Sequence, residues 1–415
     1  MQNPESESGF LFRLPFAAMA IMFALAVAAT QSAQAQTFTD LHSFTNHGDG
    51  NSPFAGPTMD RAGNIYGVTL YGGAGHGTAF KLSKRAGNWI LDTLHTFTGG
   101  SDGDSPFGNV TLGPDGNVYG TTIFGGGGCT SGGCGTVFKL SPPPRICTHT
   151  QCPWTETVIY RFSASDTGLH NPWGGVTFDS AGNIYGTTSA GGTGDCSGQG
   201  CGAVYKLTPS GGAWTASVIY NFTGFEDGEF PMATMTIDPA GNLYGTTYYG
   251  NSVFELVRSG SGWTENTLYT FQDGADGGNP QAGVIFDSAG NLYGATTTVD
   301  GSPAGGVVYE LTHSPGGWTY SVLYTYNHSG GLFGNVAIDS AGNIYGTAVT
   351  GGIYQGGSVF KMTNSGGVWS LTDLHDFGGI GWPEGNVLLD ASGNLYGTAI
   401  GGGQYGWGSV WEIQP

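Results

Sequence analysis

Basic residues are scarce in this chain, and their scarcity argues against two large classes of partner. Lys and Arg together number 11 among 415 residues, whereas Asp and Glu number 30, so the formal net charge at pH 7 is −19. Nucleic acids and anionic membranes are bound by neutralising their phosphates with Lys and Arg. We therefore predict that neither is the partner. The excess of acid favours solubility outside the cell, or attraction of cations and basic ligands.

A second long apolar run is also missing. The first run covers residues 14–29 after Arg13, and Ala33-Gln34-Ala35 follows it, a pattern typical of an export signal over residues 1–35. The run is short for a membrane span, and no later segment reaches spanning length. We therefore expect a secreted protein, periplasmic or extracellular, with no membrane span in the mature chain. Residues 36–415 are expected to form a single domain.

Catalytic signatures are scarce as well. The histidines show no ligand spacing such as His-Glu-x-x-His, and no nucleophile elbow is predicted. His42, His95 and His375 share a repeat position that Tyr fills elsewhere, so a packing role is predicted for them. No catalytic residue is assigned. A non-enzymatic role is favoured, and the question of enzyme activity stays open.

The few cysteines fall into a regular pattern. All six occur as Cys-x4-Cys pairs, namely Cys129/Cys134, Cys147/Cys152 and Cys196/Cys201. Zinc sites normally use Cys-x2-Cys. Local disulfides in an oxidising compartment are therefore favoured, although sequence alone leaves the connectivity open.

One phrase is abundant: an apolar strand, an Asp-x-x-Gly-Asn turn, and then an aliphatic residue followed by Tyr-Gly. It occurs seven times, with its Asn at Asn64, Asn117, Asn183, Asn242, Asn291, Asn343 and Asn394. Two further strand patterns follow each phrase, except that the last copy lacks its fourth strand. A matching segment, residues 38–44, precedes the first copy. Repeats of this length with several short strands are typical of propeller blades.

The predicted fold is therefore all-β. We expect a seven-bladed β-propeller with four-stranded antiparallel blades, closed by the N-terminal strand completing the last blade. In each blade the Gly of the Tyr-Gly pair is expected to let the neighbouring sheet approach closely.

The motifs resemble a known family. The pairing of Gly-Asn-(Ile/Leu)-Tyr-Gly-Thr with a following Gly-x-Val-(Phe/Tyr)-(Lys/Glu)-Leu is similar to the GloVer tandem repeat of exported bacterial proteins. The resemblance covers about residues 37–415. It implies export and a repeat array, and it implies no particular reaction or ligand.

The loops between blades suggest a binding site. Several carry Asp-Gly-x-x-Pro, and the third copy varies it with Asp166, His170 and Pro172. One interpretation is turn chemistry, with Asp capping the turn and Pro starting the inner strand. The other is a carboxylate rim that binds Ca²⁺ or a polyhydroxylated ligand, with aromatic residues beside it. The candidate binding residues are Asp49, Asp102, Asp104, His170, Asp227, Asp276 and Trp173.

Three functions follow from these observations. The favoured one is a binding scaffold at the cell exterior, with a polysaccharide or protein ligand and no cofactor other than the Ca²⁺ considered above. The second is a carbohydrate-active hydrolase or lyase that uses acids at the same rim. The third is a structural surface or matrix protein. The sequence leaves the ligand and the oligomeric state open.

Overall fold

The computed structural model describes residues 36–129, 132–143, 153–165, 168–224, 226–260, 262–302, 305–328 and 330–415. Thr37–Gln414 form one unit, to which the description below refers. Within the described ranges all regular structure is strand, and no helix there is long and apolar enough to cross a membrane. The predicted signal segment, Cys147, Cys152 and Asp166 lie outside the described residues.

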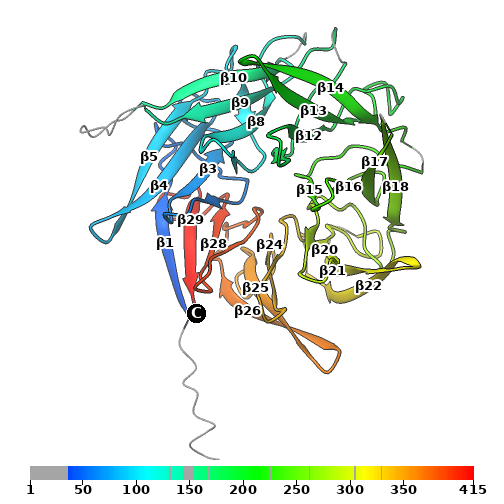
Figure 1. Ribbon diagram of the computed structural model, residues 1–415. Coiled ribbons are helices and arrows are strands. Elements are labelled where there is room, and N and C mark those ends of the chain that lie inside the picture. The colour runs from blue at the N-terminus through cyan, green and yellow to red at the C-terminus, as the bar shows by residue number, and fades with distance from the viewer. Residues whose placement is uncertain are drawn as a thin grey trace, which may run out of the picture. The chain divides into compact units, whose positions relative to one another are not determined.

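Seven antiparallel sheets follow one another around a ring (Figure 1). Blade 1 contains β2 (Thr58–Met59), β3 (Ile65–Thr69), β4 (Thr78–Arg85) and β5 (Asn88–Thr96). Blades 2 and 3 contain β7 (Thr111–Leu112), β8 (Val118–Phe124), β9 (Thr136–Ser141) and β10 (Thr155–Arg161), then β11 (Thr177–Phe178), β12 (Ile184–Thr188), β13 (Ala203–Ser210) and β14 (Ala213–Asn221). In blade 2, β6 (Asp104–Pro106) also pairs with β8.

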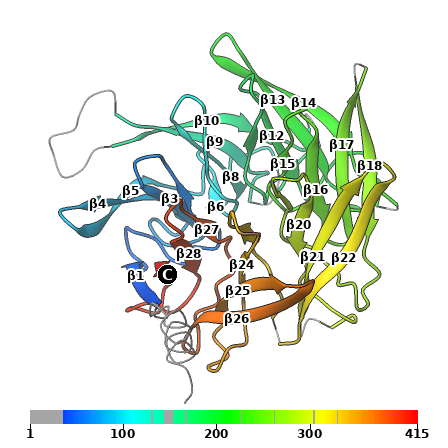
Figure 2. The ribbon, with the colours of Figure 1, turned by 60° about the horizontal axis from the view of Figure 1, so that its bottom comes forward.

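Blades 4 to 7 repeat this order from the innermost to the outermost strand (Figure 2). Blades 4 and 5 contain β15 (Thr236–Ile237), β16 (Leu243–Thr247), β17 (Ser252–Ser259) and β18 (Gly262–Thr270), then β19 (Ile285–Phe286), β20 (Leu292–Ala295), β21 (Gly306–Ser314) and β22 (Gly317–Tyr326). Blades 6 and 7 contain β23 (Ala337–Ile338), β24 (Ile344–Ala348), β25 (Ser358–Ser365) and β26 (Val368–Asp376), then β27 (Leu388–Leu389), β28 (Leu395–Ala399), β29 (Ser409–Gln414) and β1 (Thr37–Ser43).

The N-terminal strand closes the ring. In Figure 1 the blue β1 lies beside the red β29, and their register runs from Thr37 opposite Gln414 to Ser43 opposite Ser409. This pairing supplies the fourth strand of blade 7 and covers its open edge. The predicted seven-bladed propeller and its closure are confirmed.

The repeated turn is held by its own side chains. In blade 1, Asp60 accepts hydrogen bonds from the backbone N–H of Asn64 at 2.9 Å, from Asn64 Nδ2 at 2.7 Å and from the Tyr66 hydroxyl at 3.0 Å. Burial alone would raise the pKa of Asp60, but the hydrogen bonds from Asn64 and Tyr66 outweigh it and lower the pKa. The same three hydrogen bonds form in blade 2, where Asp115 lies two residues before Asn117 instead of the usual four. The turn therefore has a structural role.

The Gly after each Tyr serves a different purpose from the one expected. A Cβ on Gly67 would lie 2.5 Å from Cζ of Phe80, which is its cross-strand partner within the same blade. The expectation that this Gly admits the neighbouring sheet was therefore wrong. An aromatic side chain of the third strand lies across the Gly, as it does in the other blades.

The core lies between the blades. The cluster at the closure joins Phe44 and Val410 of blade 7 to Ile65, Phe80 and Leu82 of blade 1, all buried. Burial of apolar side chains between adjacent sheets is the main stabilising term for a ring of this kind. The inner strands are also joined by hydrogen bonds, as from Thr111 Oγ1 to the Val176 carbonyl at 2.6 Å.

Candidate functional site: the mouth of the central channel

Seven equivalent positions line one cavity. In six blades the inner segment begins with Pro, and in blade 6 it begins with Leu332; the next residue is half-buried in every case. These seven residues, which we call the mouth ring, are Phe54, Phe107, Trp173, Met232, Gln281, Phe333 and Glu384, and they line a cavity of about 60 Å³. The mouth ring lies at the end of the propeller where the fourth strand of one blade connects to the first strand of the next. We call this end the loop end.

Small residues and polar caps fix the backbone beneath the ring. The position after each ring residue is Ala or Gly, so the inner strands approach closely, and a Cβ on Gly174 would lie 2.6 Å from the Ala233 carbonyl oxygen. In blades 4, 6 and 7 the side chain at the next position caps the preceding blade. Thr234 Oγ1, for example, accepts a hydrogen bond from the Gly175 N–H at 2.8 Å. Asn386 Oδ1 accepts one from the Asn335 N–H of the preceding blade in the same way, at 2.6 Å. The ring side chains therefore stand on a rigid base.

The residue before each inner segment is left-handed. Ser52, Ser105, Asn171, Phe230, Asn279, Gly331 and Trp382 all have φ between 47° and 62°. The backbone N–H of Trp382, for example, donates to the Gly356 carbonyl at 2.8 Å. This bond sets the direction in which the chain enters the ring. The conformation is costly for bulky residues, so Phe230 and Trp382 are strained.

One side of the ring is an aromatic wall. The ring centroids of Phe54 and Phe107 are 4.0 Å apart, and those of Phe107 and Trp173 are 4.7 Å apart. Phe333 adds a fourth aromatic side chain from blade 6. Such faces suit contact with an apolar group, a planar ring or a cation.

Glu384 is the acid of the ring. Burial raises its pKa to about 7, against an ordinary value of 4.5. In the described part of the chain its carboxylate has no hydrogen-bond or ion-pair partner. The other polar side chains of the described lining, Asn109, Thr234, Gln281, Asn335 and Asn386, carry no charge.

The predicted Asp residues cap their own turns. Asp49 accepts hydrogen bonds from Thr45 N–H at 3.0 Å, from Thr45 Oγ1 at 2.5 Å and from His42 Nε2 at 3.1 Å. Burial opposes the ionised form, but these bonds lower the pKa of Asp49. Asp102, Asp227 and Asp276 take the same place in later blades, with His95, Tyr220 and Tyr269 as donors.

The His/Tyr position thus does more than pack. Each outer strand carries a β-bulge just before it, as between Asp40 and His42. At His42, His95, Tyr220 and Tyr269 the side chain reaches the Asp of the next turn. The sequence predicted packing for His42 and His95 and missed this hydrogen bond. The turn-chemistry interpretation of the Asp motif therefore accounts for every contact these carboxylates make with described residues.

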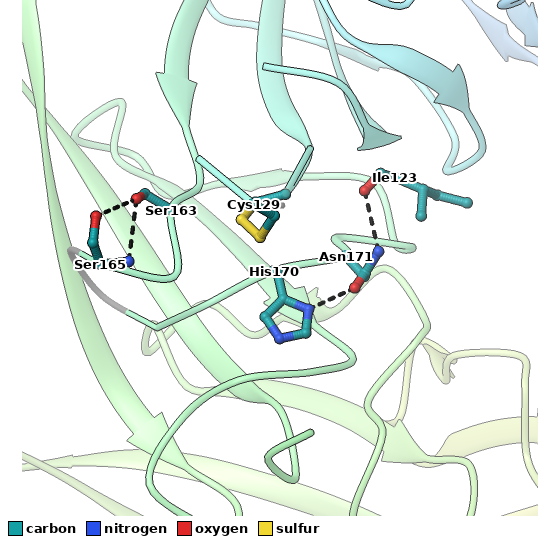
Figure 3. Close-up of a disulfide and its surroundings, with 7 residues drawn as sticks. Ile123, Cys129, Ser163, Ser165, His170 and Asn171 are labelled. Carbon is teal, nitrogen blue, oxygen red and sulfur yellow. Dashed lines mark hydrogen bonds between the residues drawn. A yellow bond between two sulfur atoms is a disulfide. The ribbon is translucent and has the colours of Figure 1, made fainter. Parts of the chain in front are cut away.

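Asp104 and His170 lie apart from the mouth ring. Asp104 is 3.1 Å from Nδ1 of His76. His170 forms a 2.6 Å hydrogen bond through Nδ1 to the side chain of Asn171, beside the Cys129 disulfide (Figure 3). Asn171 Nδ2 in turn donates to the Ile123 carbonyl at 3.3 Å.

Trp173 alone among the seven predicted residues lines the cavity. A binding role for Asp49, Asp102, Asp104, His170, Asp227 and Asp276 stays a prediction. The missed signal was the residue after the Pro, or after Leu332 in blade 6. Six further lining residues stand there that were not among the candidates: Phe54, Phe107, Met232, Gln281, Phe333 and Glu384.

The two described cysteine pairs are disulfides. Cys129–Cys134 and Cys196–Cys201 have Cα–Cα distances of 5.2 and 4.9 Å. Among the described residues, one group of three potential metal ligands comes together: Cys196, Cys201 and Glu229. Its two sulfurs are joined to each other, so a single carboxylate is left. Three carboxylates, as a Ca²⁺ site would favour, do not come together among the described residues.

One sequence match calls for a correction. Residues 99–103 spell Gly-x-Ser-x-Gly around Ser101, although no nucleophile elbow was predicted. The structure places Ser101 in the exposed turn between β5 and β6. An elbow needs a strand-to-helix turn. The match is therefore a turn sequence.

The loop end of blades 6 and 7 also carries exposed apolar side chains, which we call the loop patch: Ile353, Tyr354, Ile380, Trp382, Tyr405 and Trp407. Their three loops interlock through backbone bonds, such as Gly401 N–H to the Gly381 carbonyl at 3.0 Å. Residues 351–357, 378–382 and 400–408 contain no charged residue. Concentrated exposed apolar surface of this kind marks an interaction site.

These features place the chain in a structural class. Seven four-stranded blades around a lined mouth define a seven-bladed β-propeller with a candidate binding site at its loop end. Residues 131–335 match the Gloeobacter/Verrucomicrobia repeat, so the chain carries that repeat there, and the resemblance seen in the sequence is confirmed over this stretch.

Similarity to solved structures concerns the fold alone. Virginiamycin B lyase from Staphylococcus aureus is 12% identical, with a TM-score of 0.54, over 92% of this chain and 99% of the lyase chain. A catalytically inactive form of that lyase with quinupristin is 14% identical, with a TM-score of 0.55 over the same shares. A fungal alcohol oxidase in complex with copper is 15% identical, with a TM-score of 0.57, over 91% of this chain and 76% of the oxidase. No curated protein matches in sequence.

Proposed function

We propose that this chain is an exported propeller that binds a ligand at the mouth ring and acts as a binding scaffold. One observation carries the proposal: equivalent positions of all seven blades converge on a single cavity with an aromatic wall. Concave, mainly apolar sites with a few polar groups are the usual form of ligand sites.

The mouth supports binding better than hydrolysis. Glycoside cleavage normally uses two carboxyl groups, about 5 Å or about 6.5–9.5 Å apart. Glu384 is the one acid among the described residues that line the cavity. The lyase and the oxidase that share the fold bring no chemistry to this chain at such low identity.

Export is supported by the covalent structure. Two disulfides close short loops of blades 2 and 3. Disulfides persist in oxidising compartments, which fits the predicted signal segment. These disulfides support the proposal that the protein works outside the cytoplasm.

The loop patch supports an extended ligand, either a polysaccharide or a protein. Trp382 of the patch precedes Glu384 of the ring by two residues, so patch and ring adjoin at blade 7. Trp and Tyr supply large, rigid contact area and are over-represented among residues that dominate binding energy.

A binding screen with matched variants tests the proposal. The purified protein would be titrated with neutral and acidic polysaccharides and with proteins from the medium of the source cells. Phe333→Ala should weaken binding about thirtyfold, equivalent to about 2 kcal/mol for a central contact. Val368→Ala serves as the control, because Val368 is 71% exposed at a hairpin turn of the opposite end. If Phe333→Ala and Trp173→Ala both bind as strongly as the wild-type protein, the mouth is not the binding site.

A further inference from the structure

The mouth ring contains one residue whose chemistry differs from that of the other six. Glu384 takes the position that Phe, Trp, Met or Gln fills in the remaining blades. Two residues later, Asn386 ties this inner segment to blade 6, because its Oδ1 accepts a hydrogen bond from the Asn335 N–H at 2.6 Å. An acid at this position is a local conflict with its surroundings, and such conflicts mark functional sites.

The carboxylate of Glu384 is left without a partner. No described side chain or backbone N–H donates to it, and no described cation pairs with it. Charged groups withdrawn from water are normally paired or hydrogen-bonded. The mouth therefore presents one half-buried carboxylate that no described residue pairs with and that a bound cation can reach.

No other charge competes inside the cavity. The elements facing Glu384 contribute Phe54, Phe107, Trp173, Met232, Gln281 and Phe333, together with the neutral Asn and Thr side chains beneath them. Burial is the cause that raises the pKa of Glu384 to about 7. The net charge of −19 adds a long-range attraction for cations.

The neighbours of Glu384 are aromatic. In blade order it stands between Phe333 and Phe54, and Phe54 continues to Phe107 and Trp173 at centroid distances of 4.0 and 4.7 Å. Aromatic faces attract organic cations, and they do so more strongly where water is excluded. A cavity of about 60 Å³ has room for a small cationic group.

We infer that the mouth ring binds the ammonium group of an organic cation, with Glu384 as its counter-ion and Phe54, Phe333 and Trp173 as aromatic walls. The inference rests on the proposed function, because it uses the same mouth. A Ca²⁺ ion fits this site poorly, since it requires about six to eight oxygen ligands. A primary ammonium, as on a lysine side chain, and a methylated ammonium, as in choline, share the required chemistry.

Calorimetric titration of the purified protein at pH 8 and pH 6 tests the inference. The probes are choline, n-butylammonium and the neutral isostere of choline in which a tert-butyl group replaces the trimethylammonium group. We expect at least one ammonium probe to bind at pH 8, and the neutral isostere to bind at least tenfold more weakly. Tighter binding of choline assigns the site to methylated ammonium, and tighter binding of n-butylammonium assigns it to a lysine-like amine; both results support the inference.

Glu384→Gln keeps the shape of the side chain and removes its charge. It should weaken ammonium binding about tenfold and abolish the preference over the neutral isostere. In the wild-type protein, affinity should fall about tenfold from pH 8 to pH 6, because protons compete with the cation for the carboxylate. Exposed Glu226→Gln is the matched control and should change neither result.

Three results would overturn the inference. They are a neutral isostere that binds as tightly as the better of the two ammonium probes, ammonium binding that Glu384→Gln leaves unchanged, and no binding of either ammonium probe. If a ligand from the binding screen still loses affinity in Trp173→Ala, the proposed mouth site stands and the cation inference alone fails. If Trp173→Ala and Phe333→Ala also leave all binding unchanged, both the cation inference and the proposed function fail.

Discussion

Replacing Glu384 with Gln should stabilise this propeller above neutral pH and leave its stability unchanged in acid. The carboxyl group loses water contacts in the mouth ring, which raises its pKa from an ordinary 4.5 to about 7. The folded state therefore holds this proton more tightly than the unfolded state does. The free energy of unfolding then falls as pH rises from about 4.5 to about 7. Above pH 7 the protein bears the full free-energy cost of ionising Glu384 in the folded state.

The magnitude follows from the size of the shift. Each pKa unit corresponds to about 1.4 kcal/mol, so the raised pKa sets an upper limit of about 3 kcal/mol. The mouth is open to water, and residual screening reduces this to about 2 kcal/mol. For a domain of this size, the gain corresponds to a rise in Tm of about 2–3 °C.

Thermal unfolding of wild type and variant between pH 4.5 and pH 8.5 measures the effect. Burial also raises the pKa values of Glu156 and Glu265 to about 7, so the wild-type curve slopes for more than one reason. The informative quantity is the difference in Tm between the two proteins at each pH. Exposed Glu226→Gln is the control, because its carboxyl group keeps its water contacts. A difference for Glu384→Gln that is the same at pH 4.5 and pH 8.5 would refute the reasoning.

Three further predictions concern the blades. Gly397→Ala should lower the free energy of unfolding in urea by about 3 kcal/mol, because its Cβ would overlap the Trp411 indole. Gly378→Ala is the control and should be neutral, because a Cβ there meets open space. Similar losses in the two variants would contradict this packing account. Asp227→Ala should lower the free energy of unfolding by about 2–3 kcal/mol, because it removes the shared hydrogen-bond acceptor of Thr223 and Tyr220. An unchanged urea midpoint would show that this cap is dispensable. Replacing both Cys129 and Cys134 with Ser should lower the free energy of unfolding by about 2 kcal/mol, which is measured as a lower Tm under non-reducing conditions. An unchanged Tm would argue against a disulfide between these two residues.

The sequence by itself determined the architecture, because the information lies in local and periodic patterns. Seven copies of the Asp-x-x-Gly-Asn phrase set the number of blades, since each copy specifies one hydrogen-bonded turn and one central strand. The unpaired strand pattern near the N-terminus matched a missing strand at the other end, so the closure between β1 and β29 was predictable. Neither inference required knowledge of which side chains meet across the ring.

The candidate site was decided by the tertiary structure. Phe54 and Glu384 lie 330 positions apart in the sequence and become neighbours in the mouth ring when the ring closes. The Asp residues showed the stronger repeating signal, yet their hydrogen bonds are local and are made within their own turns. The mouth ring is filled by unlike residues at equivalent positions, so it produces no repeating letter in the sequence. Its chemistry arises from convergence around the central channel, and that convergence exists only in the folded ring.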